Sequence, residues 1–130
     1  MQIPTRLVAD TVIAKPTGRI DHQSAKEFEA ALTPLVAETC TRHGSLVLDF
    51  SAVEYISSVG LRVLMVVAKQ MRECDAQLRV AALHGIVAEI FAISRFDRIL
   101  TVTATLDDAL ALGSATALAQ YRSTGSTPAP

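Results

Sequence analysis

The chain has 130 residues, 50% of them apolar and 19% charged, with a formal net charge of −1 and no tryptophan. This length suits one domain whose core of Leu, Val, Ile and Ala side chains needs neither a metal nor disulfides. The near-zero charge and the lack of a basic cluster argue against nucleic-acid binding, and no apolar run approaches the roughly 18 residues of a membrane span.

The N-terminal part predicts two short strands and a long helix. The clearer strand candidate is Thr11–Ala14, which is rich in β-branched residues. Asp21 or Ser24 can cap the helix that follows, in which apolar residues recur at helical spacing until His43-Gly44. Pro34 lies inside this pattern, where it could kink or interrupt the helix.

The rest of the chain alternates between strands and helices. A continuous apolar run over residues 45–50 predicts a strand buried on both faces. The overall order is β-β-α-β-α-β-α-β-α, which implies a mostly parallel sheet. The elements predicted after residue 50 are a helix from Ser58 to Cys74, a strand over 76–83, a helix over 86–93, a strand over 99–102 and a helix over 106–118.

Composition also predicts the domain boundary and the redox state. We expect one domain over residues 1–120 and a flexible tail over 121–130, where Ser, Thr, Gly and Pro dominate. No signal peptide precedes Cys40 and Cys74, and both lie in apolar or helical contexts. Their number is compatible with a disulfide, yet we expect reduced thiols and a cytoplasmic protein without membrane insertion.

Catalytic and metal chemistry find little support in the sequence. His22, His43 and His84 are isolated, with no cysteine or carboxylate at ligand spacing beside them. No glycine-rich phosphate loop follows a strand, and Ser57 and Ser58 lack the flanking glycines of a nucleophile elbow. We therefore expect no enzyme activity, no metal site and no cofactor.

Ser57 and Ser58 stand where a predicted loop meets a predicted helix. Either hydroxyl can cap the helix by accepting hydrogen bonds from early backbone N–H groups. A helix N-terminus also tolerates a phosphate, because unpaired N–H groups and a partial positive charge lie there. A phosphate adds a charge of about −1.5 to −2. A partner docked at this surface would have to pair or desolvate that charge, so phosphorylation could end binding without refolding the domain.

This region resembles a known protein family. The segment Asp49-x-Ser51-x-Val53-x-x-Ile56-Ser57-Ser58-Val59-Gly60-Leu61 is similar to the signature of STAS domains, the sulfate-transporter and anti-sigma-factor-antagonist family. Gly18-Arg19-Ile20-Asp21 resembles the family element that precedes the first helix, and residues 91–100 resemble its third helix and last strand. The resemblance spans roughly residues 4–118. It implies an α/β fold, a STAS-like, mostly parallel sheet of about five strands with about four helices packed over it.

The resemblance implies a binding module. Stand-alone members act as anti-sigma factor antagonists: the unphosphorylated form binds a serine-kinase anti-sigma factor, the kinase inactivates it by phosphorylating one serine, and a serine phosphatase restores it. The family pattern is Asp-Ser-(Ser/Thr)-Gly-Leu with its first serine modified, which places the phosphoacceptor at Ser58. Ser57 stands at the Asp position and is the fallback acceptor. The implied partner-binding residues are Asp21, Ser57, Ser58, Gly60 and Arg62.

Three alternatives stay open at this point. Asp21 is either a partner-facing residue or a helix cap. The protein could instead be a STAS accessory subunit of a membrane lipid-transport complex, in which the domain is structural and unmodified. A small enzyme or nucleotide binder is the third possibility. The downstream target of an antagonist would be a sigma factor or another regulator, and the oligomeric state is open.

Overall fold

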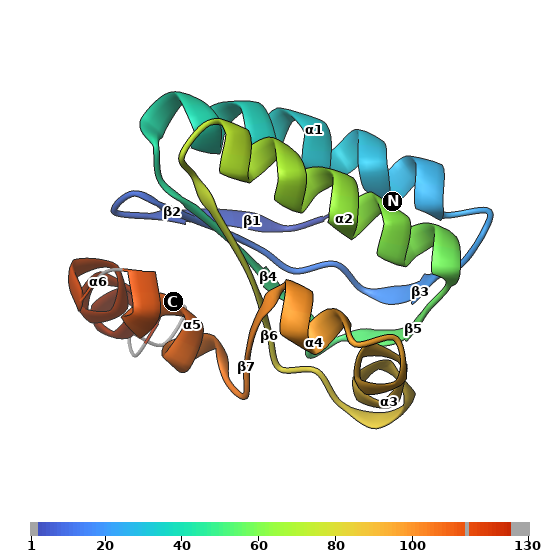
Figure 1. Ribbon diagram of the computed structural model, residues 1–130. Helices are drawn as coiled ribbons and strands as arrows, with labels where there is room; N and C mark the ends of the chain where they lie inside the picture. The colour runs from blue at the N-terminus through green and yellow to red at the C-terminus, as the bar shows by residue number, and fades with distance from the viewer. Residues whose placement is uncertain (1–2, 114, 126–130) are drawn as a thin grey trace.

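The computed structural model describes residues 3–113 and 115–125. Five strands form the main sheet: β1 (Thr5–Val8), β2 (Thr11–Ala14), β4 (Ser45–Asp49), β6 (Gln77–Ala81) and β7 (Thr101–Thr103). Their order is β1-β2-β4-β6-β7 (Figure 1). β1 is antiparallel to β2, and the other neighbouring pairs are parallel, so the predicted mostly parallel sheet is confirmed.

A second, two-stranded sheet lies beside the main one. β3 (Gly18–Ile20) pairs in parallel with β5 (Val53–Ile56). The sequence pattern does not predict these strands, because runs of 3 and 4 residues are too short to show a period. β3 leads into the first long helix and β5 leads into the second, so this small sheet sets where both helices begin.

Helices cover both faces of the main sheet. Helices α1 (Ala25–Arg42) and α2 (Ser58–Glu73) lie side by side over one face, and α5 (Leu106–Gly113) and α6 (Ala115–Gly125) lie on the other (Figure 1). Helix α3 (Gly85–Ile93) packs against β5, and the short α4 (Phe96–Ile99) leads into β7. Within residues 3–113 and 115–125, no helix combines the length and apolar character that a membrane crossing requires.

The central strand β4 divides the core into two clusters. Leu46 and Leu48 pack in the cluster that includes Leu64 of α2. Val47 points to the opposite face, into the cluster that includes Leu110 of α5. Successive side chains of a strand alternate between faces, so a strand covered by helices on both sides must be apolar throughout. The predicted burial of this strand on both faces is confirmed, since all five of its residues are buried.

The structure also differs from the sequence-based prediction in its long helices and near the end of the chain. Helix α1 runs unbroken through Pro34, which lies on its exposed side. The single helix predicted over 106–118 is divided into α5 and α6. Helix α6 continues through Gly125, so the boundary predicted at residue 121 falls inside a helix, whereas residues 126–130 of the predicted tail lie outside the described residues.

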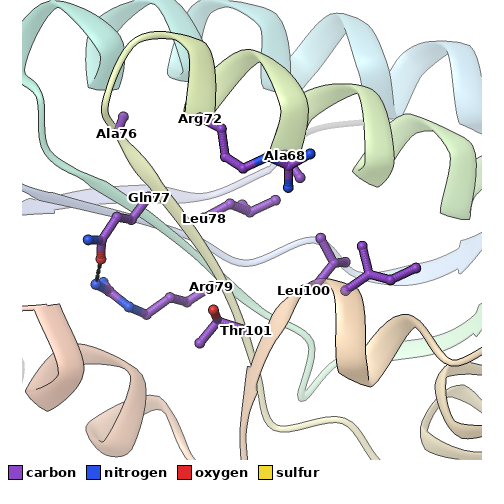
Figure 2. Close-up of a pocket in the computed structure, with 9 residues that line it drawn as sticks. Ala68, Arg72, Ala76, Gln77, Leu78, Arg79, Leu100 and Thr101 are labelled. Atoms are coloured by element: carbon purple, nitrogen blue, oxygen red, sulfur yellow. Dashed lines mark hydrogen bonds between the residues drawn. The ribbon is translucent and has the colours of Figure 1, made fainter.

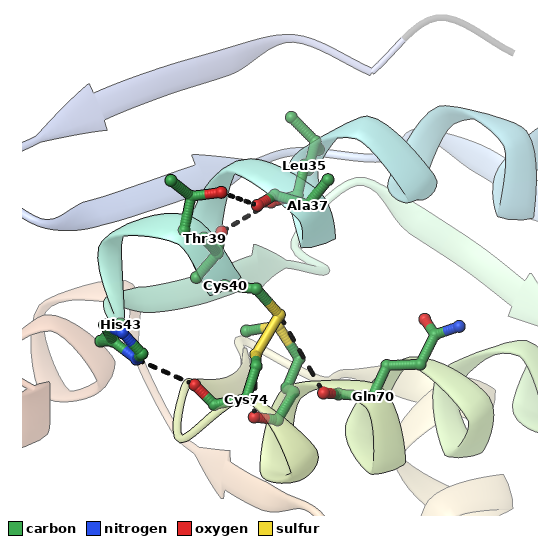
Figure 3. The surroundings of a disulfide bond; sticks show 9 residues. Leu35, Ala37, Thr39, Cys40, His43, Gln70 and Cys74 are labelled. Carbon is green, nitrogen blue, oxygen red and sulfur yellow. Dashed lines mark hydrogen bonds between the residues drawn. A yellow bond between two sulfur atoms is a disulfide. The ribbon is translucent and has the colours of Figure 1, made fainter.

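The expectation of reduced thiols is wrong for this structure, in which Cys40 and Cys74 form a disulfide (Figure 3). Cys40 lies in the last turn of α1, and Cys74 is the residue that ends α2. Both helices follow the paired strands β3 and β5 and run in the same direction, so their last turns meet. The sequence separates the two cysteines by 34 residues, and only the helix packing reveals that their Cα atoms lie 5.4 Å apart.

The packing of α2 can be tested with two substitutions on the same helix. Leu64 is fully buried, whereas Val66 is 43% exposed. We expect Leu64→Ala to lower the free energy of unfolding by about 3 kcal/mol, because it removes core contacts and leaves a cavity. Val66→Ala should change it by less than about 0.5 kcal/mol. Urea denaturation followed by circular dichroism measures both values, and equal losses would contradict the arrangement described for α2.

Candidate functional site

The chain turns directly from β5 into α2 at Ser57. Ser57 has an extended backbone, with φ −85° and ψ 170°, and is the N-cap of α2. Its Oγ accepts a hydrogen bond of 3.2 Å from the backbone N–H of Gly60. Its own N–H donates to the carbonyl of Ile20 on β3 at 2.8 Å, and its carbonyl accepts from the N–H of Leu61 at 2.9 Å. The hydroxyl, the N–H and the carbonyl of Ser57 are therefore all hydrogen-bonded, and the residue is only 5% exposed.

Ser58 differs from its neighbour in exposure. It is the first residue of α2, and its side chain is exposed to solvent. Within residues 3–113 and 115–125, its hydroxyl makes no hydrogen bond that satisfies ordinary geometry. From the sequence, either hydroxyl could cap the helix. In the structure, Ser57 caps α2 and the side chain of Ser58 is exposed to solvent.

Gly60 holds the first turn of α2 close to the small sheet. A Cβ atom at this position would lie 2.8 Å from Cγ2 of Ile20 and 2.8 Å from Cγ1 of Ile56, which is closer than real Cβ atoms come. Gly60 is also buried. The position of Gly60 supports packing of the helix onto β3 and β5, and the partner-binding role that the family resemblance implies for it stays a prediction.

Asp21 lies at the same edge of the small sheet as the serine pair. Ile20 and Ile56 are paired in parallel, so the residues that follow them, Asp21 and Ser57, both emerge there. Oδ1 of Asp21 accepts hydrogen bonds of 3.0 Å from the backbone N–H groups of Gln23 and Ser24. The backbone carbonyl of Asp21 accepts from the N–H of the first residue of α1 at 2.9 Å. Ser24 occupies the N-cap position of α1 but makes no side-chain cap bond, and the Asp21 carboxylate stabilises the turn that precedes the helix.

The hydrogen bonds to Asp21 also affect its ionisation. Donation by the backbone and then the hydroxyl of Ser24 lowers the pKa of Asp21 below its ordinary value, with a further contribution from the N–H of Gln23 and the charge of Arg19. The carboxylate is partly exposed. Asp21 consequently stays negatively charged at any physiological pH, at the same edge as the hydroxyl of Ser58.

The outer face of α2 continues from Ser58. Arg62, one helical turn beyond Ser58, is exposed, and so are Val66 and Lys69 farther along. Residues at this spacing lie on one side of a helix. The opposite side is buried in the core. Arg62, predicted as a partner contact, is therefore placed on the same accessible face as Ser58.

The structure brings further residues to this edge that sequence reasoning missed. The guanidinium of Arg19 on β3 lies 4.5 Å from the ring centroid of Tyr55 on β5, a cation–π contact. Helix α3, which packs against β5, exposes Ile86 at 52% and Ile93 at 83%, while its Phe91 is buried against Phe50. The Arg19–Tyr55 contact depends on the pairing of β3 with β5, which has no signal in the sequence.

A cavity of about 200 Å³ lies toward the opposite end of α2 from Ser58. Ala68 and Arg72 of α2, with Leu78 of β6 and Leu100 before β7, line one side (Figure 2). In that view the guanidinium of Arg79 extends away from them toward the side-chain oxygen of Gln77, to which it donates a hydrogen bond. The cavity contains none of the residues that the resemblance to STAS domains implies.

The separate roles of the two serines predict different effects on stability. Ser57→Ala should lower the free energy of unfolding by about 1 kcal/mol, because it removes the cap of α2. Ser58→Ala should change it by less than about 0.5 kcal/mol, because its hydroxyl is exposed. Thermal or urea denaturation of the two variants provides the comparison. A larger loss for Ser58→Ala would contradict the assignment of the cap to Ser57.

The ionisation of Asp21 predicts a pH dependence. A depressed pKa means that the folded state favours the carboxylate, so its stabilising effect is present above the unfolded pKa of about 3.9 and is lost as the pH falls through the lower folded value. A carbon-13 NMR titration of the side-chain carboxyl should give a midpoint below about 3.9. Ser24→Ala should raise that midpoint, because it removes one donor. A midpoint unaffected by this substitution would refute the role of the hydroxyl.

The chain is similar to known proteins in sequence and in fold. The family model of the STAS domain matches residues 2–109. The chain is 36% identical over 111 residues to BtrV of Bordetella bronchiseptica, described as a candidate anti-sigma factor antagonist, covering 85% of this chain and 93% of that protein. It is 31% identical over 93 residues to the anti-sigma-F factor antagonist RsfB of Mycobacterium tuberculosis, covering 72% and 73% of the two chains. The crystal structure of an anti-sigma factor antagonist from Mycobacterium paratuberculosis superimposes with a TM-score of 0.77 at 26% identity, covering 86% and 92%.

Proposed function

The chain belongs to the STAS domain family, and from this premise we propose that it is an anti-sigma factor antagonist switched off by phosphorylation of Ser58. In this proposal the unphosphorylated form binds a serine-kinase anti-sigma factor and releases the regulator which that factor holds. The kinase then phosphorylates Ser58, and a serine phosphatase reverses the modification. The protein itself catalyses no step.

The observation that carries the proposal is the contrast between the two serines. A kinase must reach the acceptor hydroxyl, and Ser58 is exposed at the start of α2. Phosphorylating Ser57 would first require breaking its hydrogen bond to the N–H of Gly60 and extracting a side chain from a buried position. Ser57 remains the fallback acceptor, at the cost of uncapping the helix.

A phosphate on Ser58 would change charge without changing the fold. The N-terminal end of α2 carries partial positive charge, so it can accommodate the phosphate. The modification would also add a charge of about −1.5 to −2 at the edge of the small sheet that carries the carboxylate of Asp21. A partner that docks against the neutral hydroxyl would then meet two neighbouring anionic groups, which supports release by charge repulsion.

The surroundings of Ser58 supply the other contacts of the proposed interface. Arg62 and Lys69 lie on the exposed face of α2, where charged residues at a rim mainly tune association rate and specificity. Helix α3 packs against β5, from which the chain enters α2, and exposes the apolar side chains of Ile86 and Ile93. Gly60 contributes indirectly, by holding the first turn of α2 against β3 and β5.

The proposal predicts which serine is modified. Incubation of the protein with its serine-kinase anti-sigma factor and ATP should place the phosphate on Ser58, as mapped by mass spectrometry. Ser58→Ala should abolish phosphorylation, whereas Ser57→Ala serves as the matched control because it keeps the acceptor hydroxyl. Modification confined to residues other than Ser57 and Ser58 would rule out the switch.

The same proteins test the effect on binding. Ser58→Ala should bind the anti-sigma factor as tightly as the unmodified protein in isothermal titration calorimetry. The phosphorylated protein and Ser58→Asp should bind at least about tenfold more weakly, since two unpaired like charges at an interface cost more than 1.4 kcal/mol. Equal affinities would reject charge-driven release and would favour the alternative of an unmodified accessory subunit.

A further inference from the structure

The ends of α1 and α2 carry a feature that the phosphorylation switch does not use. Cys40 and Cys74 are joined there by a disulfide, and they are the two cysteines of the chain (Figure 3). The bridge lies at the carboxyl end of α2, whereas Ser58 lies at its amino end. The domain has an extensive core on both faces of its sheet, so its fold does not depend on a disulfide in the way that small secreted domains do.

We propose that Cys40 and Cys74 form a reversible thiol–disulfide site that exchanges with a small disulfide of the glutathione class. Both cysteines are half-buried, and the adjoining Thr41, Glu73 and Asp75 are exposed, so a small thiol can reach the sulfurs from solvent. Exchange requires such access, because a thiolate must attack the bridge along the S–S axis.

The two sulfurs are arranged to stay close after reduction. Helices α1 and α2 are held together by the core, which includes Val36 on α1 and Met71 on α2. A second link also joins the two helix ends: Nδ1 of His43 lies 3.0 Å from the carbonyl oxygen of Cys74. The carbonyl can only accept, so Nδ1 carries the proton in this hydrogen bond. Reoxidation therefore begins from thiols that are already neighbours.

The chemistry balances with one equivalent of glutathione disulfide. One cysteine thiolate attacks a sulfur of glutathione disulfide, the S–S bond of that molecule breaks, and one glutathione thiolate leaves. The second cysteine thiolate attacks the protein sulfur of the mixed disulfide and displaces the other glutathione. In total the two protein thiols lose two electrons and two protons, and glutathione disulfide is reduced to two molecules of glutathione. Excess glutathione drives the same steps in reverse.

The bridge would act as a clamp on the carboxyl end of α2. It closes a chain segment that spans a sequence separation of 34 residues, which restricts the unfolded chain and raises stability. Reduction should lower the melting temperature by about 10 °C. In the native state, it should loosen the last turns of α1 and α2 and leave the first turn of α2, which is held by β3 and β5, unchanged. The disulfide site does not depend on phosphorylation at Ser58. An experiment that refutes the disulfide proposal therefore leaves the phosphorylation proposal standing, and the reverse also holds.

Equilibration of the whole protein in glutathione buffers of graded redox ratio tests the exchange. After acid quenching and alkylation, intact mass spectrometry should show a transition from the bridged form to a form with two alkylated thiols, with one midpoint inside the accessible range. A bridge that persists in glutathione alone without denaturant, or thiols that stay free in excess glutathione disulfide, would overturn the proposal. Cys40→Ser should accumulate a mixed disulfide of glutathione on Cys74, and the absence of that adduct would show that the sulfur is not accessible.

Hydrogen exchange separates a local clamp from general destabilisation. In the reduced protein, amide exchange over residues 69–73 should be several-fold faster than in the bridged protein, while exchange over residues 58–61 should be the same. The double variant Cys40→Ser/Cys74→Ser should behave as the reduced protein in both oxidising and reducing buffer. A uniform increase along α2, or none in its last turn, would contradict the clamp.

Discussion

The placement of the site depends on the first turn of α2 being packed directly against the two short strands β3 and β5. Ser57 is hydrogen-bonded through its backbone N–H to Ile20, and Gly60 leaves no room for a side chain between the helix and the isoleucines of both strands. This contact sets the rotation of the helix about its own axis. Once Ser57 is turned inward as the cap, the helical geometry forces Ser58 outward and puts Arg62 on the same exposed face.

The same small sheet explains why Asp21 and the serines share an edge. Parallel strands present their carboxyl ends together, and loops at that end of an α/β sheet commonly carry function. Asp21 is committed to the turn before α1 through its hydrogen bonds to Gln23 and Ser24. Its carboxylate is consequently a fixed charge at the same edge of the small sheet as the proposed phosphate. Holding the turn before α1 is therefore compatible with the part that we propose for Asp21 in partner release.

Helix α2 connects the two proposals physically while keeping them separate. Its inner face is buried along its length, with Leu61 near one end and Met71 near the other, so the core holds the helix between its two ends. The amino end presents the hydroxyl of Ser58, and the carboxyl end is joined to α1 through the disulfide. A rigid element of this kind can carry a modification site at each end, with local consequences for each.

The local sequence pattern determined several elements of the fold and the family of the protein. The apolar run before Phe50 determined a strand buried on both faces, and the apolar stripe beginning at Leu61 determined the long helix after it, to within one residue of its observed end. The motif around Ser57 and Ser58 also identified the family. Such features can be read from the sequence because periodicity, composition and motif spacing are properties of neighbouring residues.

The tertiary structure alone decided three other features. These are the strands β3 and β5, the burial of Ser57 beside the exposed Ser58, and the disulfide between Cys40 and Cys74. Each of these depends on contacts between segments far apart in the chain, and neither hydrogen bonding between short strands nor the rotation of a packed helix leaves a periodic signal in the sequence.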